Sequence, residues 1–408
     1  MTADGLTPER VAQWIERVEA ERKRAARPYD FPDLPDIPAG RYNDAAHFAL
    51  ERERFWSQMW LYAAHVDQVS EPGGFIVWEN GSAPILIIRG DDHKIRAFYN
   101  TCQHRGAPVA REASGMAGNR LVCGYHGWSY DRQGKLLAVT EPRDWQDITR
   151  RCIGLDEIRC EVFGSWIFVN ESGSSESLEE FLQPITRFLT HLPLSELRLM
   201  HRSVVEVECN VKLLIDNFLE VYHFKLLHPR TSDKIFDSTG SNMHLWRNGH
   251  SMMLSPNRSR QWVDPGTRGM LEMVGSTDIE KYYNPSYCLF PNLIIPIAPT
   301  GMPCVAMWPR TVRSSTLEVL WFAPDTGTEN RDPLWDTRIA NFDRIVEEDI
   351  QFAEPMQKSI ESPGFQSVPL SYQERRIYHW NEEVDRRIGE ENIDLALRIV
   401  PTLGAFIE

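Results

Sequence analysis

Residues 210–229, Asn-Val-Lys-Leu-Leu-Ile-Asp-Asn-Phe-Leu-Glu-Val-Tyr-His-Phe-Lys-Leu-Leu-His-Pro, carry the pattern around which the rest of the chain is organised. Steps of three and four residues along this stretch predict a helix with Asp216, Asn217, Glu220 and His223 on one face. Such a face is costly to bury unless its polar groups pair with one another or bind something. The stretch is therefore a candidate functional site.

His223 and His228 are the candidate metal ligands of this stretch. Their spacing places them well apart in angle on a regular helix, but Pro229 disfavours a helical conformation at His228. We therefore expect the helix to end or distort there, so that His228 turns back toward His223. Two neutral imidazoles beside a carboxylate make up most of the triad that holds non-haem Fe(II). Taken alone, the pair is equally consistent with two partly buried histidines at a helix end.

A second pair of short motifs lies between residues 102 and 128. Cys102-Gln103-His104 is followed, after eighteen residues, by Cys123-Gly124-Tyr125-His126-Gly127-Trp128. Each motif offers one cysteine and one histidine, which together form the ligand set of a Rieske [2Fe–2S] centre. A zinc site is the alternative, but zinc motifs usually pair cysteine with cysteine and histidine with histidine. The pattern favours Cys102, His104, Cys123 and His126 as cluster ligands.

Together these motifs resemble those of the α (terminal oxygenase) subunits of Rieske non-haem iron oxygenases, also called aromatic-ring-hydroxylating dioxygenases. The resemblance runs from about residue 41 to near the C-terminus, and the motifs follow the family's order. The matching pieces are Asn100–Ala107, Cys123–Asp131, and Asp216–His223 together with His228.

The third iron ligand is expected on a long helix from about residue 333 to residue 361. Asp349 is the one acidic residue on its apolar stripe, whereas Glu347 and Glu348 are expected to point elsewhere. The resemblance implies the same residue, because the family's third ligand is an aspartate on a matching helix, followed by a glutamate at the position of Glu354. The alternative is that Asp349 is a solvated helix residue.

The resemblance implies an oxygenase, acting as a mono- or dioxygenase, with a [2Fe–2S] Rieske cluster and a mononuclear non-haem Fe(II) as cofactors. Its substrates would be O2 and an organic, aromatic molecule. The chain contains no GxGxxG dinucleotide fingerprint, so a separate ferredoxin or flavin reductase is expected to oxidise NAD(P)H. Because family members pass electrons between neighbouring subunits, a homotrimer (α3) or an α3β3 assembly is expected.

Glu220 stands where, in the family, a carboxylate bridges a cluster histidine of one subunit and an iron-ligating histidine of the next, here His126 and His223. A carboxylate there accepts a hydrogen bond from each ring and orients both. The family more often has aspartate at this position, and glutamate occurs in relatives that oxidise quaternary ammonium compounds. Asp216 and Asn217 are candidates to complete the surroundings of the iron, or are helix-face residues with local partners.

Two other functions stay open. A monooxygenase or demethylase acting on a quaternary ammonium (carnitine- or betaine-like), methoxy or N-methyl substrate is favoured by Glu220. A Rieske electron carrier or ligand-binding module without oxygenase activity is the alternative from another class. The apolar pocket candidates suit either an aromatic ring or a cation–π cage; they are Phe218, Phe224, Leu227, Trp246, Phe290 and Trp308.

Composition limits the partners and the location. A net charge of −14 argues against a nucleic-acid-binding or membrane-binding surface. No stretch approaches eighteen uninterrupted apolar residues, and the N-terminus lacks the basic start and apolar run of a signal peptide. Five of the seven cysteines lie outside the cluster motifs and are expected to be free thiols. We expect a cytoplasmic protein.

The patterns and the resemblance together predict an α+β fold. A small all-β Rieske domain at residues 43–172 is expected to follow an N-terminal helix and extended arm at residues 1–42. A larger catalytic domain is expected at residues 173–408, with an antiparallel sheet covered by helices in a helix-grip, START-like arrangement. A long polar region from about residue 231 to residue 277 is expected to form a lid or access channel for substrate.

Overall fold

The computed structural model of the protein describes residues 5–148, 153–262, 267, 269–325 and 333–408. Contacts divide the chain into two compact units, one formed by Met1–Phe55 with Glu179–Glu408 and the other by Trp56–Leu178. The predicted α+β class is confirmed, because helices accompany antiparallel sheets. The expected ranges 1–42, 43–172 and 173–408 differ from these units, since the N-terminal segment packs with the larger unit as far as Phe55.

The smaller unit is built from short antiparallel strands. They are β2 (Leu61–His65), β3 (Gly74–Trp78), β4 (Ile85–Arg89), β5 (Ile95–Tyr99), β6 (Ser114–Met116), β7 (Leu121–Val122), β8 (Ser129–Tyr130), β9 (Leu136–Ala138), β10 (Glu157–Phe163) and β11 (Trp166–Asn170). Seven of them form a sheet in the order β2-β11-β10-β5-β4-β3-β6, and the other three form the sheet β7-β8-β9. The second cysteine–histidine motif lies on the connection between β7 and β8, which pair as an antiparallel hairpin.

The larger unit is built on one antiparallel sheet in the strand order β12-β18-β17-β16-β15-β14-β13. Its strands are β12 (Leu197–Val207), β13 (Asn242–Leu245), β14 (Ser251–Leu254), β15 (Pro285–Leu289), β16 (Leu293–Pro296), β17 (Met302–Thr311) and β18 (Ser314–Pro324). The short strands β1 (Ile37–Pro38) and β19 (Ser367–Val368) pair separately. The helices are α1 (Pro8–Lys23), α2 (Ala45–Arg54), α3 (Leu178–Phe181), α4 (Ile185–Leu189), α5 (Val211–Phe218), α6 (Phe224–Leu227), α7 (Ser232–Ile235), α8 (Asp278–Tyr282), α9 (Leu334–Ile360) and α10 (Arg375–Ile388).

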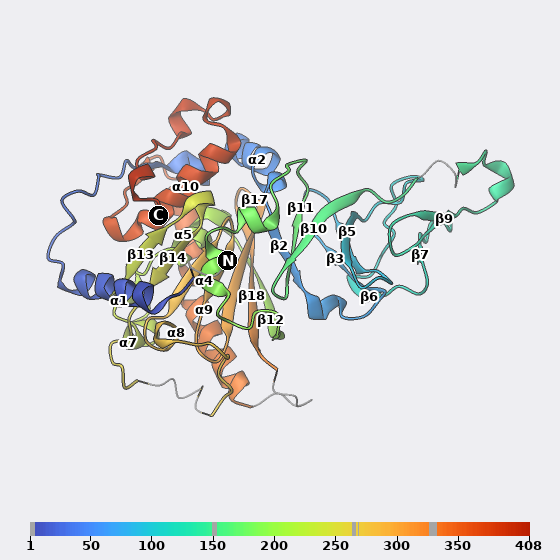
Figure 1. The fold of residues 1–408 in the computed structure, drawn as a ribbon. Helices are drawn as coiled ribbons and strands as arrows, with labels where there is room; N and C mark the ends of the chain where they lie inside the picture. Colours follow the sequence, from blue (N-terminus) through green and yellow to red (C-terminus); the bar gives the residue numbers. More distant parts are fainter. Residues whose placement is uncertain (1–4, 149–152, 263–266, 268, 326–332) are drawn as a thin grey trace. The chain divides into compact units, whose positions relative to one another are not determined.

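Helices cover both faces of this larger sheet (Figure 1). Helix α9 packs on β18, where Trp321 meets Trp335 edge-on at 5.5 Å between ring centroids. At β13 the side chain of Met243 packs against Val221, which follows α5. The next residue, His244, packs against Trp14 of α1 at 5.1 Å. Because consecutive residues of a strand point to opposite faces, the segment after α5 and helix α1 lie on opposite sides of the sheet.

The expected lid at residues 231–277 is wrong for its first half, which is regular structure. Strands β13 and β14 pair as an antiparallel hairpin within the larger sheet. At its turn, Asn248 and Gly249 have φ values of 61° and 73°, the left-handed conformation that an Asn-Gly hairpin turn requires. The Asn-Gly dipeptide is a signal in the sequence that indicates this hairpin. Residues 263–266 and 268 lie outside the described ranges.

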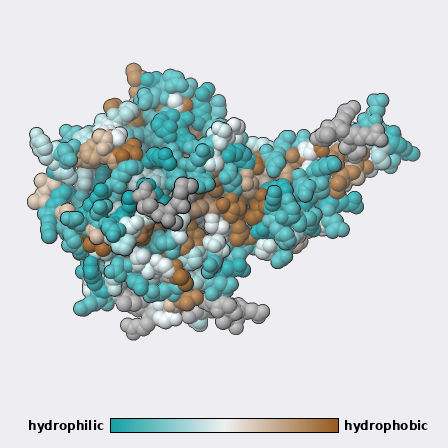
Figure 2. Space-filling model, viewed as in Figure 1, coloured by the Kyte–Doolittle hydropathy of each residue, from teal (hydrophilic) through white to brown (hydrophobic). Residues whose placement is uncertain are grey.

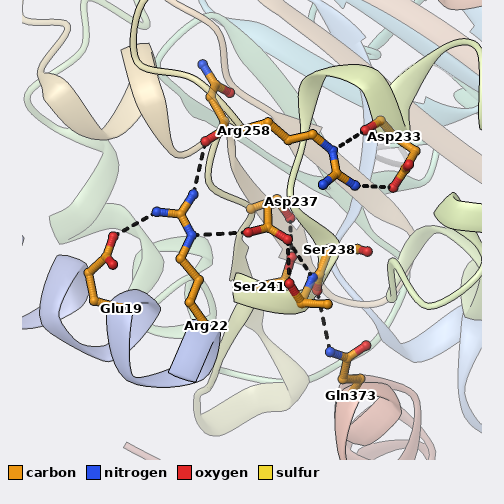
Figure 3. A network of polar contacts seen from close by, with 11 residues as sticks. Glu19, Arg22, Asp233, Asp237, Ser238, Ser241, Arg258 and Gln373 are labelled. Carbon is orange, nitrogen blue, oxygen red and sulfur yellow. Dashed lines mark hydrogen bonds and ion pairs between the residues drawn. The ribbon is translucent and has the colours of Figure 1, made fainter. Parts of the chain in front are cut away.

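Arg22 ties α1 to the chain on both sides of this hairpin (Figure 3). Its Nε donates to Asp237 Oδ2 at 3.2 Å, its Nη2 donates to the carbonyl of Asn257 at 3.0 Å, and its Nη1 donates to Glu19 Oε1 at 2.8 Å. A Cβ at Gly240 would come within 2.6 Å of Arg22 Cγ, so the arginine needs a glycine there. The N-terminal helix is therefore an integral part of the larger unit.

A buried ion pair holds α2 against α5. Lys212 Nζ lies 2.5 Å from Glu51 Oε2, with the two side chains 1% and 2% exposed. Burial raises the pKa of Glu51, but the charge of Lys212 and the hydrogen bond from His47 outweigh it and lower the pKa to about 2. The pair explains why residues 45–54 belong with the larger unit rather than with the expected range 43–172.

Replacing Lys212 with methionine is expected to lower the free energy of unfolding of the larger unit by about 3–5 kcal/mol, because the Glu51 carboxylate stays buried without its cation. Urea unfolding followed by tryptophan fluorescence measures the change. The double variant Lys212→Met/Glu51→Met is the control and should recover most of the loss, since it buries no charge. A single variant as stable as the parent would contradict a structural role for the pair.

The face drawn in Figure 2 is mostly hydrophilic. Within the described ranges, none of the helices combines the length and the apolar composition needed to cross a membrane.

Candidate metal centres

The segment that carries His223 and His228 is two short helices, α5 and α6, rather than the one expected helix. Between them, the carboxylate of Glu220 accepts hydrogen bonds from the backbone N–H groups of Tyr222 and His223. A side chain that caps backbone groups in this way competes with continuation of the helix. The expected end of the helix at His228 is confirmed, because α6 stops at Leu227 and His228 has non-helical φ and ψ values of −111° and 41°. The earlier interruption at Glu220 was not expected.

Arg376 of α10 stabilises this break by a hydrogen bond to the end of α5. Its fully buried guanidinium donates to the carbonyl of Leu219 at 3.3 Å, to the carbonyl of Ser286 at 3.3 Å and to Ser251 Oγ at 2.9 Å. Burial lowers the pKa of Arg376 to about 10, so it stays a cation at neutral pH. The sequence does not distinguish this arginine, because α10 is rich in charged residues and its pattern does not indicate which of them is buried.

The structure brings the three predicted iron ligands together. His228 Nε2 lies 2.8 Å from Asp349 Oδ1, and His223 Nε2 lies 3.5 Å from the same oxygen. One ligand atom from each residue lies within 4.8 Å of the other two. Asp349 is on the buried side of α9, with Val346 and Ala353 about one turn away on either side. The apolar stripe thus presents its single carboxylate to the two histidines.

These three side chains fit a metal ion. Neighbouring ligand atoms around one ion, with bonds of about 2.1 Å, are about 3 Å apart, close to the two separations observed. Burial lowers the pKa of His228, but hydrogen bonds and charge from Asp349 and Glu348 outweigh it and raise the pKa. The two carboxylates therefore stabilise a positive charge at His228. Two imidazoles and one carboxylate are the donor set of non-haem Fe(II) sites.

Each histidine is held by a glutamate through its other ring nitrogen. His223 Nδ1 donates to Glu220 Oε1, and His228 Nδ1 donates to Glu348 Oε2 at 2.8 Å. The expectation that Glu348 points elsewhere is wrong. Glu348 precedes Asp349 by one residue, but its side chain is longer and reaches the other side of the His228 ring. Both Nε2 atoms are thereby left free to face the same point.

Asp216 makes its hydrogen bond with a residue outside the three ligands. Asp216 Oδ2 accepts a hydrogen bond from Tyr42 Oη at 2.7 Å, while Oδ1 is buried without a partner in the described part of the chain. Burial raises the pKa of Asp216 to about 7, although Tyr42 and Lys212 oppose the rise. Among the described residues, no hydrogen bond joins Asp216 or Asn217 to the ligands. Their catalytic role stays a prediction.

Two of the six expected pocket residues, Trp246 and Phe290, pack in the core. Trp246 stacks on Phe188 at 4.9 Å, Phe290 packs on Trp380 at 5.7 Å, and both are fully buried. Phe224 instead lies 5.0 Å from His223 and 5.3 Å from His228, measured between ring centroids. It packs against the buried side chains of Val221, Met243 and Met253. The surroundings of the two histidines on this side are apolar.

The two cysteine–histidine motifs form loops with the same backbone plan. In each loop the cysteine N–H donates to the carbonyl five residues later, at 2.8 Å in both. The glycine four residues after the cysteine donates back to the cysteine carbonyl, at 2.9 Å for Gly106 and Cys102 and at 3.0 Å for Gly127 and Cys123. Both glycines have a φ of 74°, a conformation that favours glycine.

These loops bring two thiols and two imidazoles together. Cys102 and Cys123 are buried and form no disulfide. Burial raises the pKa of the Cys102 thiol, and the nearby Cys123 adds to the rise. The rings of His104 and His126 are 4.5 Å apart, and His104 Nδ1 is buried with no hydrogen-bond partner among the described residues. A buried nitrogen without a partner is costly, so the four groups fit a Rieske cluster as predicted.

Tyr130 contacts one of these thiols. Its fully buried hydroxyl lies 3.2 Å from Cys102 Sγ and accepts a hydrogen bond from the N–H of Gln103 at 3.0 Å. Because that N–H occupies the phenol oxygen as an acceptor, the hydroxyl proton is available to the sulfur. Hydrogen bonds to cluster sulfurs are one of the means by which proteins set the reduction potential.

Tyr130→Phe is expected to lower the midpoint potential of the cluster by about 40 mV. In the parent protein the hydrogen bond stabilises the reduced cluster, which is more negative than the oxidised one, by about 1 kcal/mol. Its loss therefore lowers the potential, and about 59 mV corresponds to a tenfold change in the equilibrium constant for one electron. A redox titration followed by visible absorption measures the shift. Tyr99→Phe, whose hydroxyl donates to Glu171 instead, is the control. An unchanged potential in Tyr130→Phe would show that the contact does not tune the cluster.

Two family models match the chain. The model of the Rieske [2Fe-2S] domain matches residues 59–149, and the model of the ring hydroxylating alpha subunit (catalytic domain) matches residues 194–390. These regions contain all four predicted cluster ligands and all three predicted iron ligands, in that order. The predicted cofactors, a Rieske cluster and a mononuclear non-haem iron, are confirmed by these matches.

Curated relatives include several oxygenase subunits. The glycine betaine monooxygenase oxygenase subunit of Chromohalobacter salexigens is 28% identical over 201 residues, which is 49% of this chain and 45% of the relative. The carnitine monooxygenase oxygenase subunit of Acinetobacter pittii is 29% identical over 214 residues, 51% of this chain and 57% of the relative. The matched part therefore spans about half the length of these relatives. Choline monooxygenase of Spinacia oleracea is 25% identical over 86% of this chain and 77% of its own length.

Solved structures share the fold. The quaternary ammonium Rieske monooxygenase CntA in complex with L-carnitine superposes with a TM-score of 0.71 at 21% identity, covering 89% of this chain and 99% of that one. Naphthalene 1,2-dioxygenase from Rhodococcus sp. superposes with a TM-score of 0.72 at 18% identity, covering 95% and 100%. With a Rieske domain followed by the catalytic domain of a ring-hydroxylating α subunit, the chain belongs to the family of Rieske non-haem iron oxygenase α subunits.

Proposed function

We propose that the protein is the terminal oxygenase component of a multicomponent oxygenase. It would use O2, and electrons from a separate ferredoxin or flavin reductase that oxidises NAD(P)H, to oxidise a small organic substrate. The observation that carries this proposal is the convergence of His223, His228 and Asp349 within 4.8 Å. When bound, the mononuclear iron supplies the chemistry of O2, and the cluster supplies electrons one at a time.

The chain's own residues would prepare the iron site. Three protein ligands leave other positions around an iron ion open. Glu220 and Glu348 keep both imidazoles in the tautomer that presents Nε2. Phe224 and the apolar cluster that it joins would exclude water from one side of the histidines. Excluding water strengthens the remaining electrostatic interactions and limits side reactions.

Glu220 is also the proposed electron bridge between subunits. Its Oε1 already accepts the Nδ1 proton of His223, and its side chain is 10% exposed. In the proposed trimer, His126 of a neighbouring copy would approach this carboxylate. Burial raises the pKa of Asp216 to about 7. Asp216 would act on the iron site only indirectly, by helping to place α5, the helix that precedes Glu220.

The comparisons support a small quaternary ammonium compound as the substrate. They also support a monooxygenase reaction, in which one atom of O2 is incorporated into the substrate. The glycine betaine, carnitine and choline monooxygenases all act on compounds of this class, as their names state. An aromatic substrate is the second candidate, because the residues around the histidines are apolar and include Phe224. With an aromatic substrate, the protein would act in aromatic hydrocarbon catabolism.

Turnover with isotopically labelled O2 separates the two candidates. The purified chain, with both metals and a Rieske-compatible reductase, is offered glycine betaine, carnitine and choline in one set and bicyclic aromatic hydrocarbons in another. A product of the first set with one labelled atom supports the quaternary ammonium assignment, and a diol with two labelled atoms supports the aromatic one. Fully loaded protein that gives no oxygenated product from any of a broad substrate panel would contradict the oxygenase function.

A further inference from the structure

Two consecutive residues of α9, Glu348 and Asp349, lie next to the two ring nitrogens of His228. Asp349 Oδ1 lies 2.8 Å from Nε2, and Glu348 Oε2 accepts the Nδ1 proton at 2.8 Å. The ring between them is fully buried. Because rotation of the ring would break the hydrogen bond from Nδ1 to Glu348, the fold itself orients His228.

Glu348 is held in place by groups other than the histidine. Thr231 Oγ1 donates to the same Oε2 atom at 2.6 Å, and the Arg344 guanidinium lies 3.7 Å from Oε1. With its side chain 20% exposed, Glu348 is a carboxylate committed to two donors on the segment that carries His228.

The other histidine is supported differently. Glu220 precedes His223 by three residues and belongs to the same turn, where it also caps backbone N–H groups. Glu348 comes from α9, more than a hundred residues away in the sequence. It therefore joins the α9 ligand Asp349 and the α6 ligand His228 into one arrangement that does not depend on the metal.

From this geometry we propose that Glu348 is a positioning residue for the mononuclear metal site, acting through His228, with Thr231 as its support. It would present His228 Nε2 toward the metal and make the imidazole a better donor. Carboxylates that hold a ligating histidine in this way change metal affinity about 10- to 100-fold when they are removed. The inference rests on the proposed iron site and not on the identity of the substrate.

Fe(II) binding to the full-length protein tests the proposal. The mononuclear metal is removed with a chelator under anaerobic conditions that retain the visible spectrum of the cluster, and Fe(II) is restored by equilibrium dialysis. We expect the Fe(II) dissociation constant to rise about 10- to 100-fold in Glu348→Ala. Glu348→Gln, which keeps an acceptor oxygen but loses the charge, should have an intermediate constant. Thr231→Val should show a smaller rise.

Controls separate positioning from folding. Glu347→Gln changes the exposed neighbour on α9 and should bind Fe(II) like the parent. The melting temperature of each metal-stripped variant should stay at the parental value, and the electron paramagnetic resonance spectrum of the reduced cluster should not change. Loss of affinity only in variants that are also destabilised without iron would assign Glu348 a role in folding and overturn the proposal.

Two other outcomes are also decisive. Parent-like Fe(II) affinity in Glu348→Ala would overturn the positioning role while leaving the oxygenase function intact. Failure of the parent protein itself to bind Fe(II) would instead overturn the proposed iron site, and with it this inference. The two failures are distinguished by the parent measurement, which is made first.

Discussion

Replacing His223 with alanine is expected to remove the mononuclear iron and to lower oxygenation at least about 100-fold, while the protein keeps the colour of the Rieske cluster. Two ligands, His228 and Asp349, would remain of the three that form the facial triad. The cluster ligands lie in a different unit of the chain, so their loops should not be affected. Iron and acid-labile sulfide analysis, visible spectra and product formation measure the three effects.

His201→Ala is the matched control, because His201 lies on β12 and takes no part in the converging set. It should retain both metals and full activity. Loss of cluster colour in His223→Ala would show that the assignment of the two histidine motifs is wrong. Parental activity in that variant would show that the iron, if present, is held elsewhere.

Glu220→Gln is expected to leave both metals bound and to slow oxygenation about 10- to 100-fold. Glutamine keeps the size of the side chain and one oxygen that can accept the Nδ1 proton of His223. Its amide nitrogen cannot accept the backbone N–H bonds that Glu220 Oε2 accepts. Glutamine also lacks the negative charge that favours charge transfer between two imidazoles held by one carboxylate. The effect should therefore appear in the electron-transfer step rather than in metal content.

Single-turnover experiments resolve that step. Protein with a chemically reduced cluster is mixed with O2 and substrate, and reoxidation of the cluster is followed by visible absorption. The rate should fall in Glu220→Gln and should be unchanged in Glu354→Gln, whose carboxylate pairs with Lys358 on the surface of α9. Parental reoxidation and turnover in Glu220→Gln would refute the bridging role.

Local motifs made the donor sets predictable from the sequence. Cys102, His104, Cys123 and His126 are each fixed by a short loop that closes on a glycine, so their grouping depends on few long-range contacts. Asp349 was predictable because a single carboxylate on an otherwise apolar stripe must face the interior when the helix packs. The structure brings it within reach of both histidines.

Features that depend on side-chain competition or on distant contacts were not predictable in the same way. Helical periodicity continues through residue 220 in the sequence, but the Glu220 carboxylate captures backbone N–H groups and ends that periodicity in the structure. Glu348 is about 100° from Asp349 around α9, which on its own indicates a different direction. Its contact with His228 depends on where Thr231 and α6 are placed by the whole fold.

The domain boundary shows the same limit. Residues 45–54 read as an ordinary amphipathic helix, and nothing local assigns them to either unit. The buried pair of Glu51 and Lys212 decides the matter, and a pairing across such a distance in sequence is visible only in the structure. The pocket aromatics Trp246 and Phe290 were similarly ambiguous, since a core and a ligand pocket need the same side chains.

The most direct test of the central claim is the iron and acid-labile sulfide content per chain of anaerobically purified protein, with an electron paramagnetic resonance spectrum after reduction by dithionite. A Rieske cluster together with one iron at His223, His228 and Asp349 requires about three irons and about two sulfides per chain, with the low average g value of a histidine-ligated cluster. About two irons and two sulfides, unchanged by added Fe(II), would contradict the oxygenase account and indicate an electron carrier.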